Sequence, residues 1–347
     1  MEFLEWSARV GYRFLMSTNS TRPALLVTGA AGFIGSRFVA SCNKLKIPVV
    51  SVDKESHFHD RSEHSGIDFG RLIDRDNLFH ELADPKTWAS LGIGAIVHLG
   101  ACTDTTEFDV AYLTQVNLEY SKSIWNLART KNVPLVYASS AATYGVGEHG
   151  YDDDESIIPR LRPLNPYGQS KQDFDLWALE EERQGRKPPA WSAFKFFNVY
   201  GFGERHKGKM ASVVVHAYDQ IRATGSTRLF KSHKEGILDG HQKRDFVFVD
   251  DVVHVLHFAV AKPIARGIFN LGSGTARTFL DLTGAVFKTL EKPEDIRWVD
   301  TPIEIRDKYQ YFTEAKMEKL KQEGYPKTFT SLEDGVRSYI EELTSKS

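Results

Sequence analysis

Short, uninterrupted apolar runs recur along the first two thirds of the chain, and each is followed by a small or polar residue. The first run, Ala24–Thr28, leads into the glycine-rich segment Gly29–Gly35 and then into a helical spacing of apolar residues at Phe38, Val39 and Cys42. Runs of this kind, separated by helical segments, are typical of strands buried on both faces of a parallel sheet. The pattern predicts an α/β protein with a doubly wound parallel sheet, whose further strands would be Pro48–Val52, Ala95–Leu99, Leu135–Ala138, Trp191–Phe197 and Phe246–Val249.

The alternation of strands and helices is lost in two parts of the chain, residues 201–244 and 276–347, which are also richer in charge. We therefore expect a nucleotide-binding domain made of residues 23–200 plus 245–275, and a smaller, discontinuous α/β substrate-binding domain made of the two other parts. Residues 1–22 lack the apolar core of a signal peptide, and we interpret them as a dispensable N-terminal extension.

Composition narrows the classes of function. The chain has 347 residues, of which 41% are hydrophobic and 26% charged, and its formal net charge is −2. These values are ordinary for a globular enzyme and provide no electrostatic footprint for nucleic acid. No apolar run reaches the roughly 18 residues of a membrane span. Cys42 and Cys102 are the two cysteines, and so few suit a reducing compartment. We expect a cytoplasmic protein with no metal site, no nucleic-acid partner and no membrane partner.

Three glycines, Gly29, Gly32 and Gly35, lie where a strand gives way to a helix. The first permits a tight turn, the second lets the backbone approach a pyrophosphate, and the third lets the helix pack on the strand. Asp53 follows at the end of the next strand, where such sites carry the acid that binds the adenosine ribose. The sequence therefore predicts a Rossmann-type dinucleotide site.

The residues around Asp53 leave the choice of cofactor open. Asp53 itself favours NAD, because a carboxylate hydrogen-bonds the ribose 2′-hydroxyl. Lys54 beside it and Arg61 a few residues later suit the 2′-phosphate of NADP.

Tyr167 and Lys171 stand four positions apart in a helical pattern, so their side chains would share one face. An ammonium beside a phenol favours phenolate and lowers its pKa. A Tyr tuned in this way can take the proton of a substrate hydroxyl while a hydride leaves the same carbon. Ser140, at the end of a predicted strand, is the candidate to orient the reacting oxygen. The alternatives are a half-exposed helix pair for Tyr167 and Lys171 and strand-end capping for Ser140, with Ser139 or Thr143 as the true partner.

Together, the glycine triplet, the Ser140 segment and Tyr167-x-x-x-Lys171 resemble the extended short-chain dehydrogenase/reductase superfamily, which includes the nucleotide-sugar epimerases and dehydratases. Within it, residues 24 to 340 resemble the ADP-L-glycero-D-manno-heptose 6-epimerase family. Four strings carry this resemblance: YASSAATYG at 137–145, FNVYGFGERHKGKMASV at 197–213, KRDFVFVDDV at 243–252 and IFNLGSG at 268–274. The resemblance implies an isomerase that acts on a nucleotide-sugar, ADP-heptose, with NADP as cofactor and NAD as the alternative, and that forms a homo-oligomer.

The resemblance also implies roles for individual residues. Tyr167 and Lys207 match the family's two acid/base residues, with Ser140 and Lys171 beside the reacting carbon. The cofactor-binding positions are Gly29, Gly32, Phe33, Ile34, Gly35, Asp53, Lys54, Leu99, Gly100, Ala101, Cys102, Thr103, Asn117, Lys171 and Val199. The substrate-binding positions are Asn198, Lys209, His216, Phe230, Arg244 and Tyr309. For Arg244 the alternative is a surface ion pair with Asp245.

Epimerisation of an unactivated carbinol carbon requires that its stereochemistry be erased. Transient oxidation to a planar carbonyl does this when the hydride returns to the other face. A second proton donor on that face would help, and Lys207 in the loop Gly201–Gly208 is the candidate. Its pKa would have to fall by desolvation or by a neighbouring cation. The alternative is a solvated basic loop that grips a pyrophosphate.

Three departures from the family pattern lie on the presumed substrate side. Lys209 replaces a Ser, Lys231-Ser-His233 replaces Glu-Gly-Ser, and residues 236–242 form an apparent insertion. They concern the nucleotide and the sugar rather than the type of reaction. The alternatives are another NAD(P)-dependent sugar-nucleotide epimerase, dehydratase or reductase and, in a different class, a non-catalytic dinucleotide-binding sensor. A Thr-Asp-Glu-type triplet would favour dehydration, but the chain has Ala-Ala-Thr at 141–143. A sensor would lack the Tyr–Lys pair.

Overall fold

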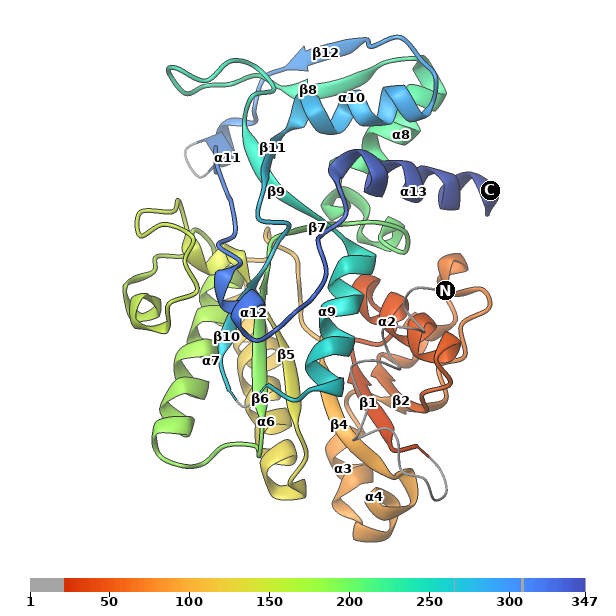
Figure 1. Ribbon diagram of the computed structural model, residues 1–347, viewed down its shortest axis with the longest axis vertical. Helices are drawn as coiled ribbons and strands as arrows, with labels where there is room; N and C mark the ends of the chain where they lie inside the picture. Colours follow the sequence, from red (N-terminus) through yellow and green to blue (C-terminus); the bar gives the residue numbers. More distant parts are fainter. Residues whose placement is uncertain (1–21, 265, 307–308, 347) are drawn as a thin grey trace.

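The computed structural model describes residues 22–264, 266–306 and 309–346. The predicted extension, residues 1–22, lies outside the described residues apart from Arg22. Figure 1 shows a large parallel sheet between two layers of helices, with a smaller group of strands and helices beyond one end of it. Among the described residues, no helix combines the length and the hydropathy that crossing a membrane requires.

The large sheet has seven strands in the order β10-β6-β5-β4-β1-β2-β3, and every neighbouring pair is parallel. The strands are β1 (Ala24–Thr28), β2 (Val49–Asp53), β3 (Arg71–Asp74), β4 (Ile93–His98), β5 (Leu135–Ser140), β6 (Trp191–Phe196) and β10 (Ile268–Leu271). From β1 the chain builds outward in both directions, so the strand order reverses between β1 and β4, where ligands of doubly wound sheets bind. The predicted fold class is confirmed.

One predicted strand was assigned to the wrong sheet. The sequence predicts that the run at Phe246–Val249 continues the large sheet, but β9 (Lys243–Phe248) lies in a separate three-stranded sheet. It is the central strand there, between β11 (Ala276–Thr278) and β7 (Asn198–Tyr200). The seventh strand of the large sheet is β10 instead. The error has a simple cause, because an apolar run predicts burial but not the sheet in which a strand is buried.

Helices cover both faces of the large sheet. On one face α2 (Phe33–Lys44) packs against α9 (Val249–Ala261), and on the other α6 (Tyr120–Lys131) packs against α7 (Pro166–Arg183). Shorter helices fill the connections: α3 (Leu78–Ala83), α4 (Pro85–Leu91), α5 (Val110–Leu113), a π-helical turn (Thr114–Glu119), and the 3-10 turns Glu55–Phe58, Ser62–His64, Ala141–Tyr144, Glu155–Arg160 and Arg205–Met210.

The smaller group has its own hydrophobic cluster, in which Tyr218, Phe287 and Tyr339 are fully buried. A Thr278–Asp281 capping box starts its helix α10, which fixes where the chain leaves β11. The other elements of this group are β7 (Asn198–Tyr200), β8 (Thr227–Phe230), β11 (Ala276–Thr278), β12 (Ile296–Val299), α8 (Val213–Thr224), α10 (Phe279–Thr289), α11 (Ile303–Arg306) and α13 (Leu332–Ser345). The short helix α12 (Glu318–Gln322) instead packs against β10 of the large sheet. β12 pairs with β8 in parallel.

Candidate active site

The glycine cradle is a turn that side chains cannot occupy. Gly29 has φ +67°, and a Cβ there would lie 2.6 Å from the backbone nitrogen of Gly100. A Cβ on Gly35 would lie 2.0 Å from the carbonyl oxygen of Gly29. Gly32 is the N-cap of α2 and has no side-chain cap, so the first N–H groups of that helix point into the turn. This cradle fits the pyrophosphate of a dinucleotide.

Phe33, Ile34 and Val199 belong to or pack against the hydrophobic clusters next to the cradle. Phe33 belongs to the hydrophobic cluster of the smaller group, and Ile34 and Val199 pack against both hydrophobic clusters of the protein. These three residues, which were predicted to line the cofactor, therefore lie where the large sheet and the smaller group meet.

Asp53 uses its carboxylate to hold the loops around the adenosine end. One oxygen accepts hydrogen bonds from the backbone of Lys54 and from Nδ1 of His57, both at 2.8 Å, and the other accepts from the backbone of Ala31 at 3.1 Å. Arg61 donates to the carbonyl of the same Ala31. Burial lowers the pKa of Arg61, and the charge of Asp53 acts in the opposite direction. A carboxylate and a cation therefore flank the predicted ribose position together.

The segment Leu99–Thr103 is clamped by a buried amide. Asn117 accepts from the backbone N–H of Cys102 at 2.8 Å and donates to its carbonyl at 3.0 Å. It also donates to the Ser170 hydroxyl on α7 at 3.0 Å. Gly100 donates to the Thr28 hydroxyl at 3.2 Å, which ties this segment to the end of β1. The loop after β4 is thereby fixed between the glycine turn and α7.

Tyr167 and Lys171 lie in the first two turns of α7, whose N-cap Asn165 accepts from Gly168 at 2.8 Å. Both side chains are buried, and the alternative of an exposed helix pair is therefore wrong. The Lys171 amino group donates to the carbonyl of Ala138 at 3.0 Å. The Tyr167 phenol interacts with the hydroxyl of Ser140, which lies at the carboxyl end of β5. The Ser140 hydroxyl also accepts from the backbone N–H of Ala142 at 3.1 Å, so the capping considered as its alternative role is present as well.

The expected tuning of Tyr167 differs from the one observed. Burial raises the pKa of Tyr167, and the hydrogen bond with Ser140 opposes this rise only partly. Burial also lowers the pKa of Lys171, to about 8, against the effect of Asp175. The expectation that Lys171 lowers the pKa of Tyr167 is wrong for the protein alone, because spacing along a helix does not reveal desolvation.

Lys207 lies on the 3-10 turn Arg205–Met210, with its amino group 5.6 Å from the centroid of the Phe33 ring. Burial lowers its pKa, and the nearby Glu204 acts in the opposite direction. Glu204 is fully buried and accepts from the backbone and the hydroxyl of Ser212 at 2.7 and 2.6 Å. Of the two causes considered from the sequence, desolvation is the one observed. The turn thus holds a half-buried lysine close to the start of α2.

Three of the predicted substrate residues form one cluster. The Arg244 guanidinium lies 5.3 Å from the centroid of the Tyr309 ring and 5.8 Å from that of Phe279. Tyr309 meets Phe230 edge-on, with 6.4 Å between centroids. Burial lowers the pKa of Arg244. A desolvated guanidinium framed by aromatic rings suits a planar base and an anionic group.

The alternative for Arg244, an ion pair with Asp245, is wrong. Asp245 is fully buried, and its carboxylate accepts from the backbone N–H groups of Ser273, Gly274 and Ala315 at 2.6 to 3.0 Å. It therefore shapes the chain around the site and leaves Arg244 to the aromatic cluster.

The other three predicted substrate residues lie apart from this cluster along the chain. Asn198 is exposed at the start of β7, Lys209 is exposed on the Arg205–Met210 turn, and His216 is half-buried in the first turn of α8. In the part of the chain that the structure describes, no side-chain hydrogen bond joins them to Arg244 or to one another.

Several residues at the site were not found from the sequence. Gln310 donates to the carbonyl of Gly145 and its own carbonyl accepts from Arg244, so it joins the aromatic cluster to the segment after Ser140. It lies in an irregular segment, where no pattern points to it. Asp175 and Lys195 form a buried ion pair next to the Ser140 segment. The sequence carries one sign of this pair, because Lys195 stands inside the apolar run WSAFKF, where a charged residue needs a buried partner.

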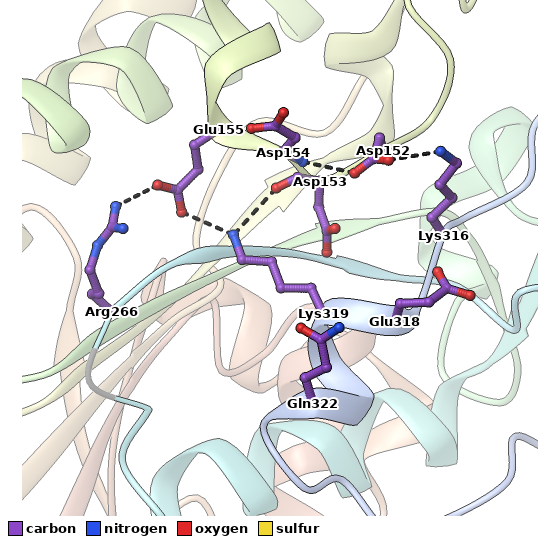
Figure 2. Close-up of a pocket in the computed structure, with 9 residues that line it drawn as sticks. All are labelled: Asp152, Asp153, Asp154, Glu155, Arg266, Lys316, Glu318, Lys319 and Gln322. Carbon is purple, nitrogen blue, oxygen red and sulfur yellow. Dashed lines mark hydrogen bonds and ion pairs between the residues drawn. The ribbon is translucent and has the colours of Figure 1, made fainter.

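Within the described ranges, no three His, Cys, Asp or Glu side chains are grouped in a way that suits a metal ion. An open cavity at the β10 edge of the large sheet is lined by acidic and basic side chains that form ion pairs with each other (Figure 2). Lys319 donates to Glu155 at 3.1 Å and to the carbonyl of Ile268 at 2.8 Å, and Lys316 pairs with Asp152 at 2.8 Å. These ion pairs tie the loop before α7 to α12, and no residue predicted for the site lines the cavity.

A glycine turn at the switch point of the sheet, with a buried tyrosine and lysine beside it, defines a dinucleotide-binding enzyme of the α/β class. Residues 25–272 match the model of the NAD dependent epimerase/dehydratase family, and the chain belongs to this family. The resemblance to the extended superfamily that the sequence indicated is confirmed.

The curated relatives include an ADP-L-glycero-D-manno-heptose-6-epimerase of Fusobacterium nucleatum, 43% identical over 93% of this chain and 98% of the relative. Another with the same name, from Nitratidesulfovibrio vulgaris, is 43% identical over 91% and 96%. Among solved structures, the enzyme of that name from Helicobacter pylori has a TM-score of 0.75 at 24% identity, covering 93% and 96%. A Thermus thermophilus UDP-glucose 4-epimerase complex with NAD has a TM-score of 0.72 at 22% identity, covering 92% and 99%. These two structures support the fold.

Proposed function

We propose that this protein interconverts ADP-D-glycero- and ADP-L-glycero-D-manno-heptose by transient oxidation and reduction at C6″. The observation that carries the proposal is the buried group of Tyr167, Ser140 and Lys171 beside a glycine cradle that admits no side chain. The choice of ADP-heptose rests on the curated relatives of that name, which match the chain over nearly its whole length.

The residues divide the proton transfers between them. As the phenolate, Tyr167 takes the proton from the C6″ hydroxyl, and the hydrogen bond with Ser140 orients the reacting oxygen. Because burial raises the pKa of Tyr167 in the protein alone, the phenolate requires added positive charge beside it. Lys171, beneath them, supplies positive charge to the same spot while it is protonated. Lys207 is the second proton-transfer group, and its burial supports this role. The nicotinamide supplies the reversible acceptor of the hydride.

For the cofactor we propose NADP, with NAD as the alternative. Lys54 and Arg61 provide positive charge beside Asp53, where the adenosine ribose would lie, and a 2′-phosphate would find two cations there. Cofactor released from the purified protein by acid and identified by mass spectrometry tests this choice. Arg61→Ala should shift the preference towards NAD.

For the nucleotide we propose the cluster of Phe230, Arg244 and Tyr309, since two aromatic rings and a desolvated guanidinium suit a base and a phosphate. Asn198, Lys209 and His216 would then contact the pyrophosphate and the heptose. The segment 231–242 follows Phe230 directly, and Gln242 donates to the carbonyl of Phe230 at 3.5 Å. The departures from the family pattern in this segment would therefore affect nucleotide recognition first.

The two-domain division, with boundaries near residues 200, 245 and 275, stays a proposal that the two hydrophobic clusters support. We also propose a homo-oligomer, since Phe108 and Val110 expose 66% and 61% of their surface beside α5. Light scattering on the purified protein tests the oligomer. A cytoplasmic location is supported by the two free cysteines.

The experiment is to incubate the purified protein with ADP-D-glycero-D-manno-heptose and follow the configuration at C6″ by NMR. The proposal predicts an equilibrium mixture of the two epimers without added cofactor, and a Tyr167→Phe preparation serves as the control. Turnover of a UDP- or GDP-sugar together with no change in ADP-heptose would refute the substrate and leave the type of reaction standing.

A further inference from the structure

Two charged side chains are completely buried beneath the candidate active site. Asp175 on α7 and Lys195 on β6 are each 0% exposed, and the Lys195 amino group lies 2.6 Å from a carboxylate oxygen of Asp175. That oxygen also accepts from the Ser139 hydroxyl at 2.7 Å, and the other accepts from Tyr137 at 3.2 Å. Lys195 faces the Tyr144 ring as well, 5.4 Å from its centroid. Both charges are therefore satisfied inside the protein.

This network holds Ser140 from both sides. Lys195 donates to the Thr143 hydroxyl at 2.8 Å, and that hydroxyl donates to the Ser140 carbonyl at 2.8 Å. On the other side, the Ser139 hydroxyl is held by Asp175. Ser139 and Lys195 are also register partners on β5 and β6. The backbone before and after Ser140 is thus attached to one ion pair.

Asp175 also lies one helical turn from Lys171, on the same face of α7 as Tyr167. Burial lowers the pKa of Lys171 to about 8, and the negative charge of Asp175 acts in the opposite direction. Two other titratable groups face Lys171. They are His98 on β4 and Cys102 in the loop after β4. Asp175 is the fixed negative charge among them.

We infer that Asp175 and Lys195 are positioning residues for the reaction at Tyr167, because their ion pair fixes the backbone that presents the Ser140 hydroxyl to Tyr167. The inference rests on the proposed function. Stability alone explains such a pair poorly, since apolar replacement of a buried ion pair is often neutral or stabilising. The position of this pair, attached to the chain on both sides of Ser140, gives it a use in orientation.

Thr143→Val tests the connection most directly, because it removes the hydroxyl between Lys195 and Ser140 at almost constant volume. We expect kcat to fall about 10- to 100-fold with an unchanged KM, since the reacting oxygen is no longer well oriented. Thr143→Ser keeps the hydroxyl and should retain kcat. Equal kcat values in these two variants would overturn the inference.

The double variant Asp175→Leu with Lys195→Met separates orientation from stability. Both charges are lost together, so no unpaired charge is left buried. We expect a melting temperature close to that of the wild type, with kcat reduced about 10- to 100-fold. A stable double variant with wild-type kcat would overturn the inference, and if the double variant does not fold, the two Thr143 variants decide. Glu180→Gln breaks an exposed pair with Arg183 on the same helix and should change neither quantity.

The titration of Lys171 gives a readout that needs no substrate. Asp175→Asn should lower the pKa of Lys171, measured by NMR of labelled lysine, and should shift the alkaline limb of the kcat profile to lower pH. A Lys171 pKa that is lowered together with a wild-type kcat would contradict the inference, because the ion pair would then be lost without effect on the reaction. Failure of the wild type to act on ADP-heptose would contradict the proposed function instead, so the two failures are distinguishable.

Discussion

The two ends of the candidate site are built from different parts of the chain. At the proposed cofactor end, the surface is backbone, held close by Gly29 and Gly35 and by the amide of Asn117. At the nucleotide-sugar end, it is side chains, with Arg244 between the rings of Tyr309 and Phe279. A backbone surface tolerates almost no substitution, whereas a side-chain surface can be changed one residue at a time.

The largest effect should come from Tyr167→Phe, between the two ends. Loss of the hydroxyl removes the proton acceptor, and we expect kcat to fall about a thousandfold while the bound cofactor and KM stay unchanged. Steady-state kinetics and the absorbance of the bound cofactor measure these quantities. The exposed Tyr112→Phe is the matched control. Near-wild-type activity of Tyr167→Phe would remove this residue from the mechanism.

Gly29→Ala should break the cofactor end alone. The new Cβ would meet the backbone of Gly100 at 2.6 Å, so the turn must open and cofactor retention should fall about 100-fold or more. Gly92→Ala is the control, since Gly92 also has a positive φ, +58°, but nothing within 4 Å of its Cβ. The amount of cofactor per chain after purification is the readout. Equal retention in both variants would show that close approach is not what matters.

Arg244→Lys should weaken the other end. The ammonium cannot stack between Tyr309 and Phe279 as a planar guanidinium does, so we expect KM for the nucleotide-sugar to rise about tenfold with little change in kcat or cofactor content. Arg228→Lys, at an exposed position on β8, is the control. A fall in kcat at constant KM would place Arg244 at the chemistry rather than at the nucleotide.

The smallest effect concerns Lys171 and pH. Its pKa is lowered by burial to about 8, whereas in the unfolded chain it is near its usual value of about 10.4. Between these values the unfolded state binds more protons, so this residue makes the free energy of unfolding rise with pH, by up to about 1.4 kcal/mol per pH unit. Below pH 8 the cost of burying the ammonium is fully present.

Lys171→Met has no ammonium to bury and therefore lacks this pH dependence. The wild type should gain stability relative to the variant as the pH rises above 8. Urea unfolding of both proteins at several pH values measures the difference. The exposed Lys187→Met is the control. A difference that is constant from pH 7 to 10 would contradict the lowered pKa.

The sequence predicts the glycine turn and the Tyr167–Lys171 helix as structure, but not the contacts around Arg244. The glycine turn and the Tyr167–Lys171 pair are local patterns with strict spacing, and the fold class follows from the alternation of apolar runs and helices. The placement of β9 could not be predicted, because burial does not specify a sheet. The pKa of Tyr167 could not be predicted either, because it depends on desolvation by distant segments. Gln310 and the Asp175–Lys195 pair depend on contacts between elements far apart along the chain.

The central claim is that one carbon is oxidised and reduced again while its hydrogen stays on the enzyme as a hydride. The direct test is turnover of ADP-heptose deuterated at C6″ in ordinary water, followed by NMR and mass spectrometry of the product. The account predicts that the inverted product keeps its deuterium. Deuterium washed out into the solvent during inversion would indicate proton abstraction from carbon and would contradict the account.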